Sequence, residues 1–100
     1  MTKKDLPPSA LLDVHLLQLF ELIYGSRSVT RAAEHLGLAQ PTVSIWLAKL
    51  RKQLNDPLFV RTPSGMLPTP EADALIGTVR QALESLRYLA QRDAKFDPAT

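Results

Sequence analysis

The sequence predicts a mostly α-helical domain: a winged helix–turn–helix with a small β-hairpin wing, followed by a long C-terminal helix. Three observations carry this prediction. Residues 29–48 contain two helical patterns joined by a short turn. Residues 58–67 contain two β-prone runs around a turn, which predicts the wing. Residues 70–92 repeat apolar residues at helical spacing, which predicts a long helix.

The composition limits the class of protein. A chain of 100 residues holds one small domain, or one domain with an extra arm. It contains no cysteine, which excludes disulfides and thiolate metal sites. No apolar run reaches the ~18 residues of a transmembrane helix, and the start lacks the apolar core of a signal peptide. We therefore expect a cytoplasmic protein that does not associate with membranes.

The net charge of +2 is unevenly distributed. Residues 25–62 carry six lysines and arginines against two acidic residues, a net charge of +4, whereas residues 1–24 and 63–100 each carry −1. The positive charge is thus concentrated on the helix pair and the wing, as in surfaces that bind phosphates. A solvated basic face is the alternative, and charge alone does not choose between the two.

The first helix follows a short arm. Residues 1–11 are expected to form a flexible arm because two adjacent prolines cannot lie inside a helix. The helix begins at Ser9 or Asp13, both suitable N-caps, and runs to about Tyr24, with Gly25 ending it. Its main apolar residues, at i, i+4 and i+7, are Leu16, Phe20 and Ile23.

The second helix is predicted over Val29–Leu36, with Ser28 or Thr30 as its N-cap. Gly37 follows it and can adopt the positive φ angle that a tight turn needs. These features make residues 29–48 the helix–turn–helix of a domain that spans residues 12–69.

The third helix is predicted over Gln40–Leu54. Ala39 stands where a hydroxyl cap is expected, at a cost of about 1 kcal/mol. Its apolar stripe consists of Val43, Leu47, Leu50 and Leu54. The opposite face is small near its start and basic further along, the layout of a helix that reads base edges. Trp46 flanks the stripe, either as a boundary residue or as a surface residue touching DNA or a partner.

The wing and the last helix complete the domain. Arg61 and Thr62 lie near the predicted tip of the wing, where they suit phosphate or minor-groove contact. Thr69 caps the helix over residues 70–92, and Pro70 begins it. Two overlapping heptad seams make this helix too apolar for a small monomer, so one seam can pack on a partner helix. The candidate dimerisation residues are Leu75, Ile76, Val79, Leu83, Leu86 and Leu89.

Several motifs occur in a fixed order along the chain: Val29–Glu34, Leu36, Gln40–Ser44, Leu47, Leu50, Asp56–Arg61 and Leu67–Pro70. In this combination they resemble the N-terminal DNA-binding domain of LysR-type transcriptional regulators, over about residues 12–91. Residues 50–51 together with 56–61 resemble the members that respond to aromatic or flavonoid inducers.

The resemblance implies a bacterial transcription factor that acts at the nucleoid and binds two-fold symmetric duplex DNA. It implies a homodimer, often within a tetramer, with a recognition helix in the major groove and the wing on the backbone or minor groove. It implies no cofactor in this domain, because the small-molecule effector binds a C-terminal domain that residues 93–100 would lead into. The chain is then a fragment of a longer regulator, with a complete stand-alone repressor as the alternative.

Nine residues are candidate DNA contacts: Arg31, Gln40, Pro41, Thr42, Ser44, Ile45, Lys49, Arg61 and Thr62. Arg31 could instead be a solvated surface arginine, and Gln40 could instead bond its own backbone at the helix start. Those from 41 to 45 are assigned to base edges, and the three basic residues to phosphates. The chain departs from the family pattern at Ala39, Ile45 and Arg51. Isoleucine cannot make the bidentate contact of an arginine to guanine, but it can meet a thymine methyl group.

Two other classes of function compete with DNA binding. Enzymatic activity is not expected, because His15 and His35 lie on separate helices without a nucleophile pattern. Asp13 lies two residues before His15, but positions this close along a helix are not expected to face each other. A helix–turn–helix that binds proteins and not DNA remains the alternative. Salt-dependent binding to duplex DNA distinguishes it from a transcription factor.

Overall fold

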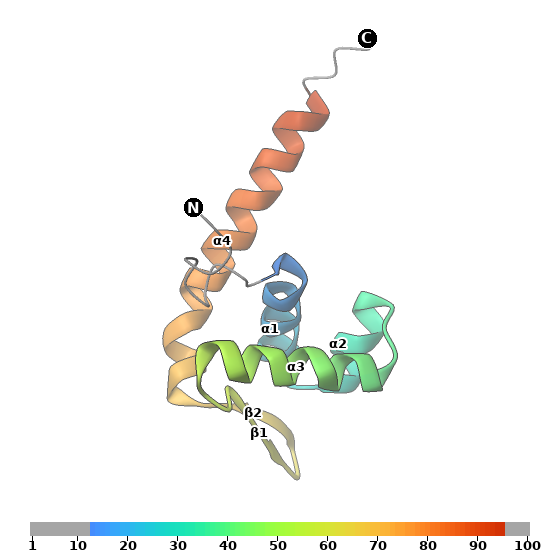
Figure 1. The fold of residues 1–100 in the computed structure, drawn as a ribbon, viewed down its shortest axis with the longest axis vertical. Helices are drawn as coiled ribbons and strands as arrows, with labels where there is room; N and C mark the ends of the chain where they lie inside the picture. The colour runs from blue at the N-terminus through green and yellow to red at the C-terminus, as the bar shows by residue number, and fades with distance from the viewer. Residues whose placement is uncertain (1–12, 96–100) are drawn as a thin grey trace, which may run out of the picture.

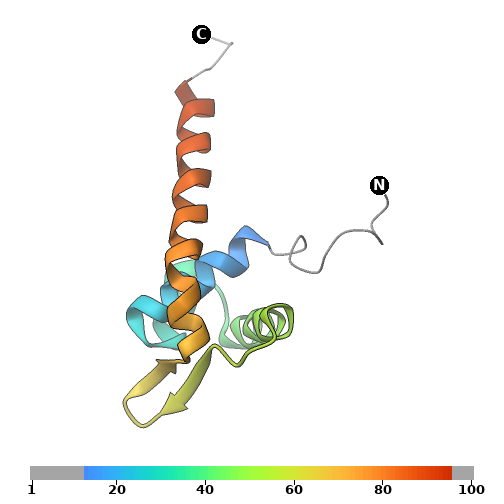
Figure 2. The ribbon, with the colours of Figure 1, turned by 90° about the vertical axis from the view of Figure 1, so that its left-hand side faces the viewer.

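The computed structural model describes residues 13–95. Its elements are α1 (Val14–Ser26), α2 (Val29–Leu36), α3 (Gln40–Leu54), β1 (Phe59–Thr62), β2 (Gly65–Pro68) and α4 (Pro70–Lys95). Figures 1 and 2 show α3 and the hairpin at one end of the molecule and the far end of α4 at the other. The predicted arm, residues 1–11, lies outside the described residues, as do the last five residues of the predicted linker. No helix in the described part is long and apolar enough to cross a membrane.

Asp13 is the N-cap of α1. Its carboxylate accepts a 2.8 Å hydrogen bond from the backbone N–H of His15 and lies 2.9 Å from Nδ1 of the His15 ring. The expectation that these two side chains do not face each other was therefore wrong. Asp13 has an extended backbone outside the helix, so its side chain folds back over the first turn.

The cap titrates with pH. The backbone hydrogen bond from His15, followed by the contact with the His15 ring, lowers the pKa of Asp13 below its ordinary value of 3.8. The cap therefore stabilises the fold fully above that ordinary value. Its contribution is lost as the pH falls through the lower pKa of the folded state.

The end of α1 differs from the prediction. Gly25 does not end the helix, which continues to Ser26. Arg27 ends it in the left-handed conformation at φ 59°, and its N–H donates to the carbonyl of Ile23. This conformation turns the Arg27 carbonyl toward the wing, where it accepts a 2.9 Å hydrogen bond from the N–H of Met66. A tertiary contact, and not the local glycine, accompanies the end of α1.

The helix–turn–helix matches its predicted bounds. Ser28 caps α2 by accepting a hydrogen bond from the N–H of Arg31, and Gly37 adopts φ 68° in the turn. Ala39 makes no side-chain cap to α3, as expected. Trp46 is half-buried and packs against the core, which confirms its interpretation as a boundary residue.

The core is built around α1. Leu19, Phe20 and Ile23 are fully buried between α2, α3 and α4. The ring of Phe20 meets that of Phe59 at a centroid distance of 5.4 Å, which links α1 to the base of the wing. The apolar stripe of α3 faces this core, which leaves the opposite face of α3 exposed.

Gly65 docks the wing on the turn between α1 and α2. The wing is an antiparallel pair in which Arg61 faces Met66. Gly65 has φ 129°, and a Cβ atom there would lie 2.7 Å from the Arg27 carbonyl oxygen. Only glycine allows this close approach. The position of the Arg61 side chain is thereby tied to the helix–turn–helix.

The segment after α3 is held by two side chains. Arg51 donates hydrogen bonds to the carbonyls of Pro57 and Phe59, at 2.8 and 2.9 Å. A carboxylate oxygen of Asp56 accepts from the N–H of Leu58 at 2.8 Å and from the Thr69 hydroxyl at 2.7 Å. Arg51 departs from the family pattern, and this structure assigns it to the junction of α3 and the wing.

We expect Asp56→Ala to lower the free energy of unfolding by about 2–3 kcal/mol, because it removes a charged acceptor shared by two donors. Leu58 has φ 64°, so its strained backbone also loses a supporting contact. Chemical denaturation of Asp56→Ala and of Glu34→Ala, an exposed carboxylate, checks this. Equal losses in the two variants would show that the Asp56 contacts contribute nothing.

The first half of α4 belongs to the core of the chain itself. Ile76, Val79 and Leu83 are buried there, and Leu75 is half-buried.

Polar contacts also join α1 to α4: Glu21 to Arg87 at 3.3 Å, Glu21 to Arg80 at 3.8 Å, and Tyr24 to Asp73 at 2.7 Å. The Asp73 hydrogen bond raises the pKa of Tyr24 above its ordinary value of 10.0.

The second half of α4 extends away from the core (Figure 1). Leu86 and Leu89 are 43% and 60% exposed. The helix reaches Lys95, three residues beyond its predicted end.

Candidate nucleic-acid interface

An open groove of about 540 Å³ lies between the start of α2, the start of α3 and the wing. We call it the α2–wing groove. Four of the predicted DNA contacts line it: Arg31, Gln40, Ser44 and Arg61. They come from three different elements and are brought together only by the fold.

The α2–wing groove is positively charged. All its charged lining residues in the described part of the chain are arginines: Arg27, Arg31 and Arg61. The N-terminus of α2 also opens on it, with Ser28 as the cap. Backbone N–H groups at a helix start favour anions. The groove therefore suits a phosphate of a nucleic-acid backbone.

The exposed start of α3 borders the groove. Pro41, Ser44 and Ile45 are exposed there, whereas Thr42 is half-buried. Ile45 is 57% exposed, although it is a large apolar side chain. Figure 2 shows α3 and the hairpin together at the end of the molecule that lies opposite the far end of α4. A single helix presented in this way fits the major groove of B-DNA, which is about 12 Å wide.

Two predicted contacts already have partners within the chain. The side-chain amide of Gln40 donates to the Thr30 hydroxyl at 2.7 Å, which links α3 to α2. The Thr62 hydroxyl donates to the carbonyl of Gly65 at 2.8 Å and closes the turn of the wing. Their assignment to DNA stays a prediction, and each has a structural contact in addition.

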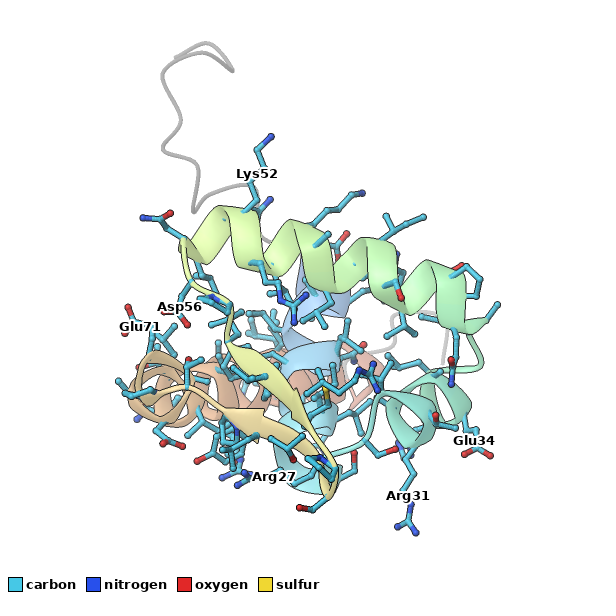
Figure 3. The ribbon with its side chains drawn as sticks, turned by 90° about the horizontal axis from the view of Figure 1, so that it is seen from below. Arg27, Arg31, Glu34, Lys52, Asp56 and Glu71 are labelled. Carbon is cyan, nitrogen blue, oxygen red and sulfur yellow. The ribbon has the colours of Figure 1, made fainter. Side chains whose placement is uncertain are left out.

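Lys49 lies apart from the α2–wing groove. It lines a separate hollow of about 350 Å³ beside Asp13, His15 and Trp46. Figure 3 shows the molecule from below. Lys52 projects on one side of α3, and Arg27 and Arg31 lie on the opposite side of this helix. Basic side chains thus flank the exposed face of α3 on both sides. A duplex held against this face would have a strand on either side.

The structure adds five residues with polar side chains to the lining of the α2–wing groove: Ser26, Arg27, Ser28, Thr30 and Ser64. The sequence signals were the charge of residues 25–62 and the hydroxyl residues around the start of α2. Without the position of the wing, these residues could not be assigned to one site. Arg27 is partly engaged already, since its Nε donates to the carbonyl of Tyr24 and its guanidinium lies over the Tyr24 ring.

Comparisons with known proteins agree with this geometry. Residues 14–73 match the family model of bacterial regulatory helix–turn–helix proteins of the lysR family. The transcriptional activator NahR of Pseudomonas putida is 48% identical over 89 residues, which are 89% of this chain and 30% of NahR. The chain thus spans about a third or less of the curated relatives that it matches first.

Solved structures share the fold. PA0477 from Pseudomonas aeruginosa is 36% identical, with a TM-score of 0.76 over 83% of this chain and 28% of that one. The BenM DBD in complex with catB site 1 DNA has a TM-score of 0.77 at 23% identity, over 84% of this chain and 94% of that one. The chain therefore belongs to the lysR family of bacterial regulatory helix–turn–helix proteins, and its winged helix–turn–helix is that family's DNA-binding transcription-factor domain.

Proposed function

We propose that this chain reads duplex DNA as a homodimer, with α3 in the major groove and the wing on the backbone or in the minor groove. One observation carries the proposal. The α2–wing groove brings Arg31, Gln40, Ser44 and Arg61 together from three elements, beside the exposed face of α3. The base-reading residues would be those at the start of α3, and the arginines would hold phosphates.

The proposed dimer forms through the far half of α4. Leu86 and Leu89 are exposed on a helix that extends beyond the core, away from the proposed DNA surface. Pairing there would place two reading heads on one duplex, at least one helical turn apart, and predicts a two-fold symmetric site. In a regulator as long as the curated relatives, a tetramer and a small-molecule effector domain would extend this arrangement. Such a regulator would act at the nucleoid.

The test is titration of labelled random-sequence duplexes at two salt concentrations, followed by selection of preferred sites. We expect steep salt dependence and two-fold symmetric selected sites. Failure to bind any duplex at low salt, by a folded and dimeric protein, would favour the protein-interaction module instead.

Two variants separate the proposed roles. Arg61→Ala should weaken binding to every duplex and lower the salt slope by about one ion, because a phosphate contact carries no sequence information. Ser44→Ala should change the selected sequence, at about 1–3 kcal/mol if its base contact is a good one. Both residues are exposed, so circular dichroism should show unchanged folding. An unchanged selected sequence for Ser44→Ala would remove Ser44 from the base contacts.

A further inference from the structure

Ile45 has an unusual environment for its chemistry. It is the single large apolar side chain that is exposed in α2 and α3, both of which are fully described. The buried stripe of α3 lies on the other side of the helix. At about 100° per residue, Pro41 and Ala48 fall on the same side of α3 as Ile45. Both are exposed, so the three form an apolar patch on the proposed reading face.

The fold gains little from isoleucine at this position. An exposed isoleucine has a lower helix propensity than alanine and buries little surface. Its χ1 angle is nearly fixed in a helix, because two heavy atoms branch from Cβ. The side chain is therefore held in one orientation before any ligand binds, and a contact made through it costs little further ordering.

Base edges in the major groove offer one apolar group. Guanine, cytosine and adenine present hydrogen-bond donors and acceptors, whereas thymine also presents its C5-methyl group. An isoleucine side chain has no donor or acceptor to match the polar groups, and would bury them unpaired. Against a thymine methyl group, it would bury apolar surface on both sides instead.

We propose that Ile45 reads the C5-methyl group of a thymine at one position in each half-site, which makes it a specificity-determining residue for an A·T pair. The inference rests on the proposed function, since it requires α3 in the major groove. The inference goes beyond the proposed function because it names the chemical group that is read and the side chain that reads it. Ser44 and the arginines of the α2–wing groove then supply polar contacts around an apolar centre.

The test uses a duplex selected by the 100-residue chain from a random library. Each thymine is replaced in turn by deoxyuridine, which removes only the methyl group and keeps every hydrogen bond. At the position read by Ile45, we expect affinity to fall about fourfold per half-site, the value of one buried carbon. Replacement in both half-sites should lower it about 15-fold.

Variants assign the effect to the side chain. In Ile45→Ala, the same deoxyuridine substitution should change affinity less than about twofold, because the apolar partner is gone. In Leu67→Ala, which truncates a 56% exposed side chain on the wing, the full methyl dependence should remain. Alanine is favoured in helices, so Ile45→Ala is expected to fold.

Three results would overturn the inference. Wild-type affinity could be indifferent to deoxyuridine at every thymine, or the deoxyuridine effect could be equal in wild type and Ile45→Ala. Either result would reject only the recognition of the methyl group by Ile45 and would leave DNA binding intact. Selection of no duplex at all would reject the proposed function together with this inference.

Discussion

Replacing Leu86 and Leu89 by glutamate is expected to convert the protein to a monomer and to weaken binding to a two-fold symmetric site between about 100-fold and 10,000-fold. Both side chains are exposed on the part of α4 that leaves the core. Two glutamates there would place like charges against each other across a two-fold axis. The second reading head would then no longer be held near the DNA. Analytical ultracentrifugation and titration of the selected duplex measure the two effects.

The control adds the same charge elsewhere on α4. Gln81→Glu with Gln91→Glu changes two exposed positions that lie at least about 80° around the helix from both Leu86 and Leu89. This variant should remain dimeric and lose only the small affinity that two added negative charges cost through long-range repulsion. A dimer that survives the leucine substitutions at micromolar concentration would place the interface elsewhere.

Phe20→Ala is expected to lower the free energy of unfolding by about 3–5 kcal/mol. Phe20 is fully buried, and its ring packs on that of Phe59 at the base of the wing. Its loss leaves a cavity between α1 and the wing and removes an aromatic pair worth about 0.5–1.5 kcal/mol beyond buried area. For a domain of this size the melting temperature should fall by more than about 12 °C.

Thermal unfolding followed by circular dichroism measures this loss. Tyr88→Ala is the matched control, because it truncates an aromatic ring that is 56% exposed on α4. It should change the free energy of unfolding by no more than about 0.5 kcal/mol. A loss of less than about 1 kcal/mol for Phe20→Ala would mean that the Phe20–Phe59 contact does not link α1 to the wing.

Local signals were sufficient for most of the secondary structure. The bounds of α2 and α3 follow from Gly37 and from apolar residues that repeat at helical spacing, and the structure confirms them. The hairpin and the start of α4 also have local causes, since Thr69 caps α4 by accepting a hydrogen bond from the N–H of Ala72. Caps, turns and periodicity act within a few residues, which is why the sequence alone predicts them.

Tertiary structure decided the rest. α1 ends at Arg27 and not at Gly25, with the Arg27 carbonyl bonded to the wing. Of the two apolar seams on α4, the fold buries Ile76, Val79 and Leu83 in the chain's own core and leaves Leu86 and Leu89 exposed.

The α2–wing groove likewise depends on contacts between distant parts of the chain. Arg61 lines the same groove as Arg31 and Ser44 because Gly65 allows the wing to lie close to the end of α1. The sequence by itself determined which residues could cap, turn, pack or bind, since these properties belong to single side chains and their near neighbours. Which of them share a surface was decided by packing, because it depends on where the chain returns after the turns.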